Sequence, residues 1–275
     1  MRKSFLFVLF VIAVTGMTTA LAAAAPPLVM AEAAVVMVAD TRQVLYAKNA
    51  DSIMYPASTT KIMTLTVSLE QGAADSVVTV GRQAAGCEGS SLELKAGDRL
   101  HLREAEYGMM LVSGNDAAEA IAESVAGSIP AFVELMNAKA QSIGATRTHF
   151  SNPHGLPDPV NHFTTAYDLA LITAYALQNP AFAQIVATRD YAVRLLNRPE
   201  LIHAGNTNKL LGAYAGATGV KTGFTNDAGE CLVAAAKRDN VQLIAVVLNS
   251  DYRWTDTASL LDYGFAQLGW KSSLL

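Results

Sequence analysis

The stretch Tyr55-Pro-Ala-Ser-Thr-Thr-Lys61 places a serine, Ser58, three residues before a lysine, Lys61. Residues three apart on a helix lie on one face, about one turn from each other. A serine hydroxyl is a poor nucleophile until a neighbour takes its proton. A lysine amine can take that proton only where burial or a second cation keeps the amine neutral. The pair therefore indicates a nucleophile and its base, although this spacing alone also occurs by chance in long proteins.

Acyl transfer also needs a proton donor for the leaving group and groups that hold the substrate. The segment Ser113-Gly-Asn115 offers both, because Ser113 can relay a proton to the leaving amine and Asn115 can hold a substrate amide. Taken singly, this segment would be read as a cap before a helix, in the same way that Ser58 would be read as a helix cap.

A third segment, Lys221-Thr-Gly223, supplies a second cation. Lys221 can keep Lys61 neutral by like-charge repulsion, anchor a substrate carboxylate, or do both. Thr222 adds a hydroxyl beside that carboxylate. A strand edge that runs through Gly223 and Phe224 can accept an extended peptide as an additional strand.

The three motifs, in this order, match the set found in class A β-lactamases and penicillin-binding proteins. The chain resembles most closely the D-alanyl-D-alanine carboxypeptidases, which are low-molecular-weight penicillin-binding proteins of the serine D,D-peptidase family. The resemblance covers about residues 30 to 266 and rests on these stretches: Pro56-Ala-Ser-Thr-Thr-Lys-Ile-Met-Thr64, Glu88-Gly-Ser-Ser91, Ser113-Gly-Asn-Asp-Ala117, Asn152-Pro-His-Gly-Leu156, Asn206-Thr-Asn-Lys-Leu-Leu211, Gly219-Val-Lys-Thr-Gly-Phe-Thr225 and Leu260-Leu-Asp-Tyr-Gly-Phe265.

The resemblance implies a role for each matching residue. Ser58 would form the acyl-enzyme, Lys61 would be the general base, and Ser113 would assist proton transfer. Substrate would be held by Asn115, Lys221, Thr222 and Gly223, and the backbone N–H groups of Ser58 and Phe224 would form the oxyanion hole. The family binds peptidoglycan stem peptides and is acylated by β-lactam antibiotics; no metal or organic cofactor is implied.

The fold implied is α+β, the penicillin-recognising serine transferase fold of β-lactamases and transpeptidases. It has a five-stranded antiparallel sheet flanked by helices, together with a helical lobe. The residue patterns agree, since they predict strands near both ends of the chain and helices between them. The strands are expected at 34–39, 43–48, 217–222, 230–237 and 242–249, and the helices at 58–71, 103–112, 116–126, 130–143, 165–178 and 255–268.

The first 24 residues have the features of a secretory signal peptide: Arg2 and Lys3, then an apolar run, then small residues before the expected cleavage site. Residues 25–275 are expected to form one catalytic domain, with the helical lobe at about 72–165 and no C-terminal β domain. We expect an exported protein of the periplasm or cell-wall space with at most peripheral membrane association. In that oxidising space the two cysteines, Cys87 and Cys231, are expected to be free thiols rather than a disulfide.

The composition and the remaining motifs argue against several other functions. A net charge of −4 without a Lys/Arg-rich run gives no basis for binding nucleic acid. Glu134 and Asn137 have a Glu-x-x-Asn spacing similar to that used in β-lactamase deacylation, but they lie in a helical pattern and are expected on a helix surface. His149 and His154 lack the His-Glu-x-x-His spacing of a zinc peptidase, so no metal site is predicted.

The sequence thus predicts a serine D-Ala-D-Ala carboxypeptidase that removes the terminal D-alanine of stem peptides through an acyl-enzyme on Ser58. Two alternatives remain. One is a D,D-endopeptidase that cleaves peptidoglycan cross-links with the same residues, and the other is a non-catalytic envelope protein that binds peptidoglycan. Two sites also differ from those of some relatives: Thr207 stands where some have arginine, and Phe224 where some have histidine.

Overall fold

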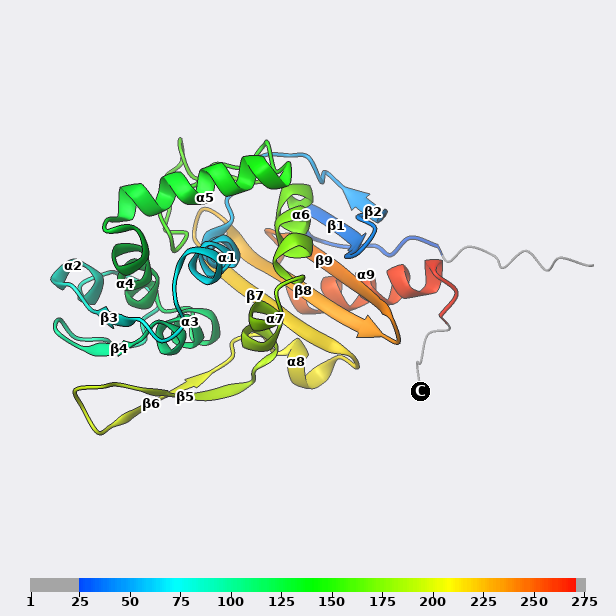
Figure 1. Cartoon of the computed structure of the whole chain (residues 1–275). Coiled ribbons are helices and arrows are strands. Elements are labelled where there is room, and N and C mark those ends of the chain that lie inside the picture. Colours follow the sequence, from blue (N-terminus) through cyan, green and yellow to red (C-terminus); the bar gives the residue numbers. More distant parts are fainter. Residues whose placement is uncertain (1–24, 271–275) are drawn as a thin grey trace, which may run out of the picture.

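The computed structural model describes residues 25–270, and its centre is a five-stranded antiparallel sheet. The strand order is β2-β1-β9-β8-β7, so the first two strands of the chain lie beside the last three (Figure 1). The strands are β1 (Ala33–Val38), β2 (Val44–Lys48), β7 (Ala217–Thr225), β8 (Gly229–Arg238) and β9 (Val241–Leu248). The predicted α+β class and the five-stranded sheet are confirmed. The predicted signal peptide lies outside the described residues.

The sheet is buried on both faces, which explains the continuous apolar runs in its central strands. Val35 of β1 pairs with Val246 of β9, and both side chains belong to the larger hydrophobic core. The next pair, Val36 and Ala245, faces the opposite side and belongs to a second core. Helices α6 (Ala166–Ala176) and α7 (Pro180–Ala187) cover the first face, and α9 (Arg253–Gln267) covers the second (Figure 1).

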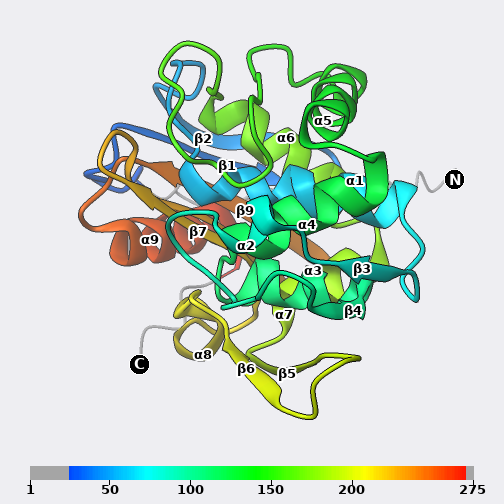
Figure 2. The same ribbon diagram turned by 90° about the vertical axis from the view of Figure 1, so that its left-hand side faces the viewer.

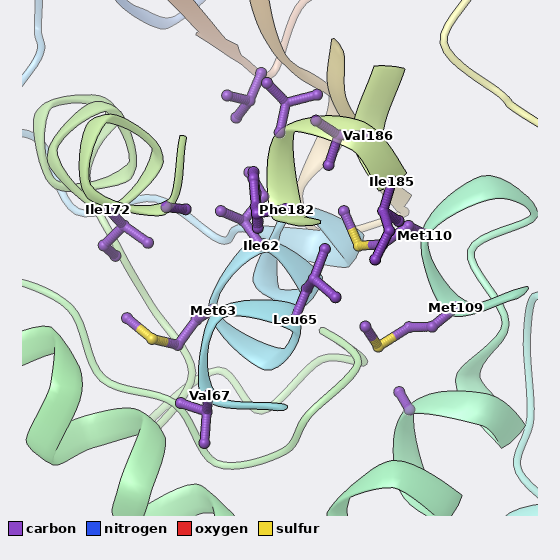
Figure 3. Close-up of a cluster of buried hydrophobic side chains, with 14 of the residues drawn as sticks. Ile62, Met63, Leu65, Val67, Met109, Met110, Ile172, Phe182, Ile185 and Val186 are labelled. Carbon is purple, nitrogen blue, oxygen red and sulfur yellow. The ribbon is translucent and has the colours of Figure 1, made fainter. Parts of the chain in front are cut away.

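Helix α1 (Lys61–Gln71) runs through the middle of the molecule, and its residues from Lys61 to Ser68 are all buried. Ile62 and Leu65 point toward Phe182 and Ile185 of α7 (Figure 3). A fully buried side chain of this size contributes roughly 2 kcal/mol to stability. The position of Lys61 at the start of α1 is therefore fixed by the packing of the helix that carries it.

The helical lobe contains α2 (Arg82–Ala85), α3 (Leu102–Leu111), α4 (Asn115–Ala126) and α5 (Ile129–Ile143), with a small sheet of β3 (Val77–Thr79) and β4 (Arg99–His101). Helices α3, α4 and α5 begin and end within one residue of the predicted bounds. Helix α4 packs against α1, α2, α3 and α5. It therefore connects the lobe to the helix that bears Lys61.

Besides α2, the elements that go beyond those expected from the sequence include α7, α8 (Leu210–Ala213) and the hairpin of β5 (Asp190–Arg194) and β6 (Leu201–Gly205). The hairpin projects from the body of the molecule in both views (Figures 1 and 2). Only Val193 and Ala204 of its two strands are buried, so the hairpin adds little to the hydrophobic core.

In the described part of the chain, no single helix has the length and apolar character needed to cross a membrane. The bent pair α6 and α7 passes that test together, on length and composition only. Most residues of α6 are buried inside the protein.

Candidate active site

Ser58 lies in a short 3-10 turn, Ala57–Thr60, directly before α1. The predicted helix over 58–71 is thus an α-helix only from Lys61. The turn differs because Ala57 has a left-handed backbone, with φ of 46°, and because the Thr59 N–H donates to Pro56 O at 3.2 Å. As a result Ser58 is half-buried, whereas Lys61 is completely buried. The Ser58 hydroxyl can be reached from outside, while the neighbouring Lys61 amine is shielded from water.

The Lys61 amine has three partners. Its Nζ lies 3.1 Å from Ser58 Oγ, and it donates to Asn115 Oδ1 at 2.7 Å and to the backbone oxygen of His154 at 2.8 Å. These partners come from the turn before α1, the first residue of α4, and the loop 152–156. Three separate parts of the chain therefore hold one nitrogen beside the serine hydroxyl.

Burial lowers the pKa of Lys61 well below its ordinary value of 10.5, and the nearby charge of Lys221 lowers it further. Removing an ammonium from water disfavours the charged form, and a like charge nearby acts in the same direction. The effect of Lys221 agrees with the expectation from the sequence, but burial is the larger cause.

Both polar atoms of the Asn115 side-chain amide make hydrogen bonds. Oδ1 accepts from Lys61, while Nδ2 donates to the backbone oxygen of Glu88 at 2.6 Å. The backbone N–H of Asn115 also donates to Ser90 O at 2.7 Å. In this state the side chain positions Lys61, a contact that the sequence motif does not reveal.

Ser113 has a left-handed backbone, with φ of 66°, at the end of α3. Its Oγ is buried and makes no hydrogen bond with any residue in the 25–270 range. A buried hydroxyl normally has a partner. Ser113 therefore presents an unused donor and acceptor in the segment that also carries Asn115.

Lys221 and Thr222 lie on β7, and both are buried. Burial lowers the pKa of Lys221 to about 7, and the charge of Arg253 acts in the same direction. Lys221 Nζ donates to the backbone oxygen of Thr222 at 3.1 Å. The hydroxyl of Thr222 shares a hydrogen bond of 2.7 Å with the hydroxyl of Thr207. Thr207 thus adds a second hydroxyl at the position where some relatives carry arginine.

β7 is one of the two edge strands of the sheet, and it passes close to the turn that carries Ser58. A Cβ on Gly223 would lie 3.1 Å from both Pro56 O and the backbone nitrogen of Ser58. A side chain at this position would push the strand away from the nucleophile. Phe224, the next residue, is 59% exposed. The strand edge predicted from the sequence is therefore present. Gly223 on this edge lies against the turn that carries Ser58, and the exposed ring of Phe224 follows it.

The loop Asn152-Pro-His-Gly-Leu156 is a part of the site to which the sequence assigns no contacts. Besides the His154 oxygen that accepts from Lys61, Pro153 O accepts from the Thr64 hydroxyl at 2.5 Å. Gly155 has φ of 95°, and a Cβ there would overlap the carbonyl oxygen of Ala57. The signal that could have found this role is the rigid Pro and Gly pattern of the loop itself.

The remaining candidates lie elsewhere or have other contacts. Glu134 is exposed on α5, as predicted, and His149 Nδ1 lies 2.6 Å from Asn161 O on the surface. Cys87 and Cys231 are free thiols, as expected. The sequence predicts no cluster of ligands around His154, and here the structure differs. It brings Cys87 and Glu119 next to the His154 side chain.

Comparisons with known proteins agree with this geometry. The family model described as D-alanyl-D-alanine carboxypeptidase matches residues 20–252. The chain is 37% identical over 246 residues to D-alanyl-D-alanine carboxypeptidase DacF of Bacillus subtilis, covering 86% of this chain and 62% of that protein. It is 36% identical to DacB2 of Mycobacterium tuberculosis, covering 82% of this chain and 79% of that protein. The chain therefore spans less than two thirds of the Bacillus relative but more of the mycobacterial one.

Solved structures show the same fold. The crystal structure of the Streptomyces K15 DD-transpeptidase superposes with a TM-score of 0.83 at 34% identity, over 88% of this chain and 100% of that chain. D-alanyl-D-alanine carboxypeptidase from Mycobacterium tuberculosis superposes with a TM-score of 0.84 at 33% identity, over 89% of this chain and 94% of that chain. The predicted fold is confirmed, and the chain belongs to the D-alanyl-D-alanine carboxypeptidase family.

Proposed function

We propose that this protein is a serine-type D-Ala-D-Ala carboxypeptidase that removes the terminal D-alanine from peptidoglycan stem peptides. The observation that carries the proposal is the set of partners around Lys61. Two of them, Asn115 Oδ1 and His154 O, only accept hydrogen bonds, and the third is the Ser58 hydroxyl. A neutral amine has two N–H groups for the two oxygens and one lone pair for a hydroxyl proton. Burial lowers the pKa of Lys61 well below its ordinary value, so the amine fits this set of partners in its unprotonated form and can activate Ser58.

The proposed reaction proceeds in two steps. Ser58 Oγ attacks the carbonyl carbon between the two D-alanines, and its proton passes to Lys61 Nζ. The proton then goes to the nitrogen of the departing D-alanine, with the free hydroxyl of Ser113 as relay. Water hydrolyses the ester on Ser58, which releases the shortened peptide and restores both side chains.

Substrate is held on the opposite side by β7. Lys221 in its charged form, with the hydroxyls of Thr222 and Thr207, would bind the terminal carboxylate of the substrate. The backbone N–H groups of Ser58 and Phe224 would face the oxyanion, since Gly223 brings the two segments together. β-Lactam antibiotics, which present a carboxylate and a strained amide, would acylate Ser58 in the same pose.

The proposed location is outside the cytoplasmic membrane, in the periplasm or cell-wall space. It rests on the pattern of residues 1–24. Mass spectrometry of the mature protein would find its N-terminus near residue 25 if this is right, and at Met1 if it is wrong.

The decisive experiment compares the parent with Ser58→Ala. The parent should release D-alanine from a stem-peptide analogue and carry one covalent penicillin on the peptide that contains Ser58. In the variant, D-alanine release and covalent penicillin labelling should each fall by a factor of about 10³ or more, as is usual when a nucleophile is removed. D-Alanine release by the variant at the parent rate would refute the mechanism. Cleavage of cross-linked dimers without release of terminal D-alanine would instead favour the endopeptidase.

A further inference from the structure

Three metal-binding side chains from three separate elements meet behind the Lys61 site. Cys87 follows α2, Glu119 lies on α4 one turn after Asn115, and His154 lies in the loop 152–156. The Cys87 thiol donates to Glu119 Oε1 at 3.4 Å, and His154 Nε2 lies 3.3 Å from the same oxygen. The three ligand atoms all lie within 4.8 Å of one another.

These separations fit a metal ion. Zinc binds cysteine sulfur at about 2.3 Å and histidine nitrogen or carboxylate oxygen at about 2.0–2.2 Å, so ligand atoms in a tetrahedral site lie about 3.3–3.6 Å apart. Two of the three pairs already have that spacing. The third pair, Cys87 Sγ and His154 Nε2, needs at most a small side-chain movement.

We propose that Cys87, Glu119 and His154 form a three-ligand site for a borderline-soft divalent metal ion, of which zinc is the best match. Mixed sulfur, nitrogen and oxygen ligands suit zinc better than calcium or magnesium, which prefer oxygen alone. The thiolate and the carboxylate together balance the two positive charges of the ion. Water would take the fourth position, reached from the side of the half-buried Cys87.

A second observation at Glu119 points the same way. The residue is only 8% exposed, and its Oε2 is buried without a hydrogen-bond partner in the described part of the chain. The Gln83 side chain also lies near this carboxylate. The buried carboxylate therefore has spare capacity to bind a cation.

Metal binding changes where the protons of Cys87 and His154 lie. The Cys87 thiol loses one proton to solvent as sulfur bonds to the metal. His154 Nδ1 now accepts from the Leu156 N–H at 3.2 Å, so the ring proton sits on Nε2. That proton must move to Nδ1 when Nε2 binds the metal, which breaks the bond from Leu156. Three long hydrogen bonds, the two to Glu119 Oε1 and the one from Leu156, are exchanged for three metal–ligand bonds, and one proton is released per ion.

The metal site would link the surroundings of Lys61 to the helical lobe. The His154 residue that offers its ring to the metal offers its backbone oxygen to Lys61. A bound ion would therefore tie the segment after α2, the helix α4 and the Lys61 loop into one unit. We expect zinc to raise the melting temperature of the protein progressively as its free concentration rises above its Kd.

The test uses Co²⁺ as a spectroscopic substitute for zinc on the purified protein. One ion per chain should bind and give both the visible bands of a tetrahedral site and a near-ultraviolet band from a cobalt–thiolate bond; Zn²⁺ should remove both. Cys87→Ser should abolish the thiolate band, and Glu119→Gln should weaken binding by at least about tenfold. Cys231→Ala is the matched control and should retain the full spectrum.

A measurement on the parent alone covers the case in which a variant does not fold. Zinc should protect Cys87 from iodoacetamide, as mapped by mass spectrometry. The proposal is overturned if excess Co²⁺ produces no thiolate band, if the band survives in Cys87→Ser, or if zinc leaves the alkylation of Cys87 unchanged. None of these readouts depends on peptidase activity, so they remain informative whether or not the proposed function is correct.

Discussion

At the scale of single residues, the proposed mechanism gives the two buried lysines opposite tasks. Lys61 must be neutral to accept a proton from Ser58, and burial holds its pKa well below 10.5. Lys221 must be charged to bind a carboxylate, yet burial lowers its pKa to about 7. Activity therefore needs a pH high enough for a neutral Lys61 and low enough for a charged Lys221. The two lysines also repel each other, so a charge on Lys221 favours the neutral form of Lys61.

This arrangement predicts the alkaline side of the pH profile. In the free protein, Lys221 loses its charge as the pH rises through about 7, so kcat/KM for a substrate with a free carboxylate should fall above that pH. Lys221→Arg keeps its charge to high pH and should remove that fall, even if its absolute rate is lower. The measurement is kcat/KM for D-alanine release between pH 6 and about 9. An identical alkaline limb in parent and variant would show that Lys221 does not set it.

At the scale of elements, the turn that carries Ser58 is shaped by the loop packed against it. Gly155 lies against the carbonyl of Ala57, where no Cβ fits, and its φ of 95° is one that L-residues rarely adopt. Gly155→Ala should displace the turn that carries Ser58, lower the free energy of unfolding by roughly 3 kcal/mol or more, and sharply reduce labelling by a fluorescent penicillin.

Gly144→Ala is the matched control for that substitution. Gly144 ends α5 with φ of 93°, and a Cβ there would meet nothing within 4 Å. Its replacement carries only the backbone strain, about 1–2 kcal/mol, and should leave penicillin labelling intact. Denaturant unfolding and labelling rates measured on both variants separate strain from displacement. Equal effects of the two substitutions would contradict the role given to Gly155.

The elements also show which features the sequence can predict. β8 and β9 are predictable because both of their faces are buried and their apolar runs are continuous. The β5–β6 hairpin gives no such signal, because it is mostly exposed and buries one residue in each strand. α7 does have a detectable signal, since Asn179 caps it and Pro180 is its first residue, although the expected elements do not include it.

The candidate site also contains some features that the sequence can predict and others that it cannot. Ser58, Lys61 and Lys221 belong to motifs with a chemical rationale and can be named from the sequence. Asn115 and the backbone oxygen of His154 accept hydrogen bonds from Lys61, although they lie 54 and 93 positions away from it in the sequence. Likewise, Cys87, Glu119 and His154 have no recognisable spacing along the chain. Contacts of this kind arise from tertiary packing, and local patterns do not encode them.

At the scale of the whole molecule, the junction between α1 and α3 contains a carboxyl group that resists ionisation. Glu106 of α3 is 1% exposed; its Oε1 accepts from the Ser68 hydroxyl of α1 at 2.7 Å, and its Oε2 has no partner among residues 25–270. Burial raises the pKa of Glu106 to about 7, above its ordinary value of 4.5. Since the folded state holds this proton more tightly than the unfolded state, the stabilising contribution is complete below pH 4.5 and is lost as the pH rises through about 7.

Glu106→Gln should remove that dependence, because the amide stays neutral at every pH. A pKa shift of this size corresponds to roughly 3 kcal/mol in the free energy of unfolding. Between about pH 4.5 and about pH 8, the stability of the variant relative to the parent should therefore rise by about that amount. Glu134→Gln, the same change at an exposed site on α5, should follow the parent throughout. The measurement is the free energy of unfolding in urea across this pH range. If Glu106→Gln and Glu134→Gln follow the same curve, the α1–α3 junction does not hold a proton, and the ionised carboxylate must be stabilised there by a contact other than Ser68.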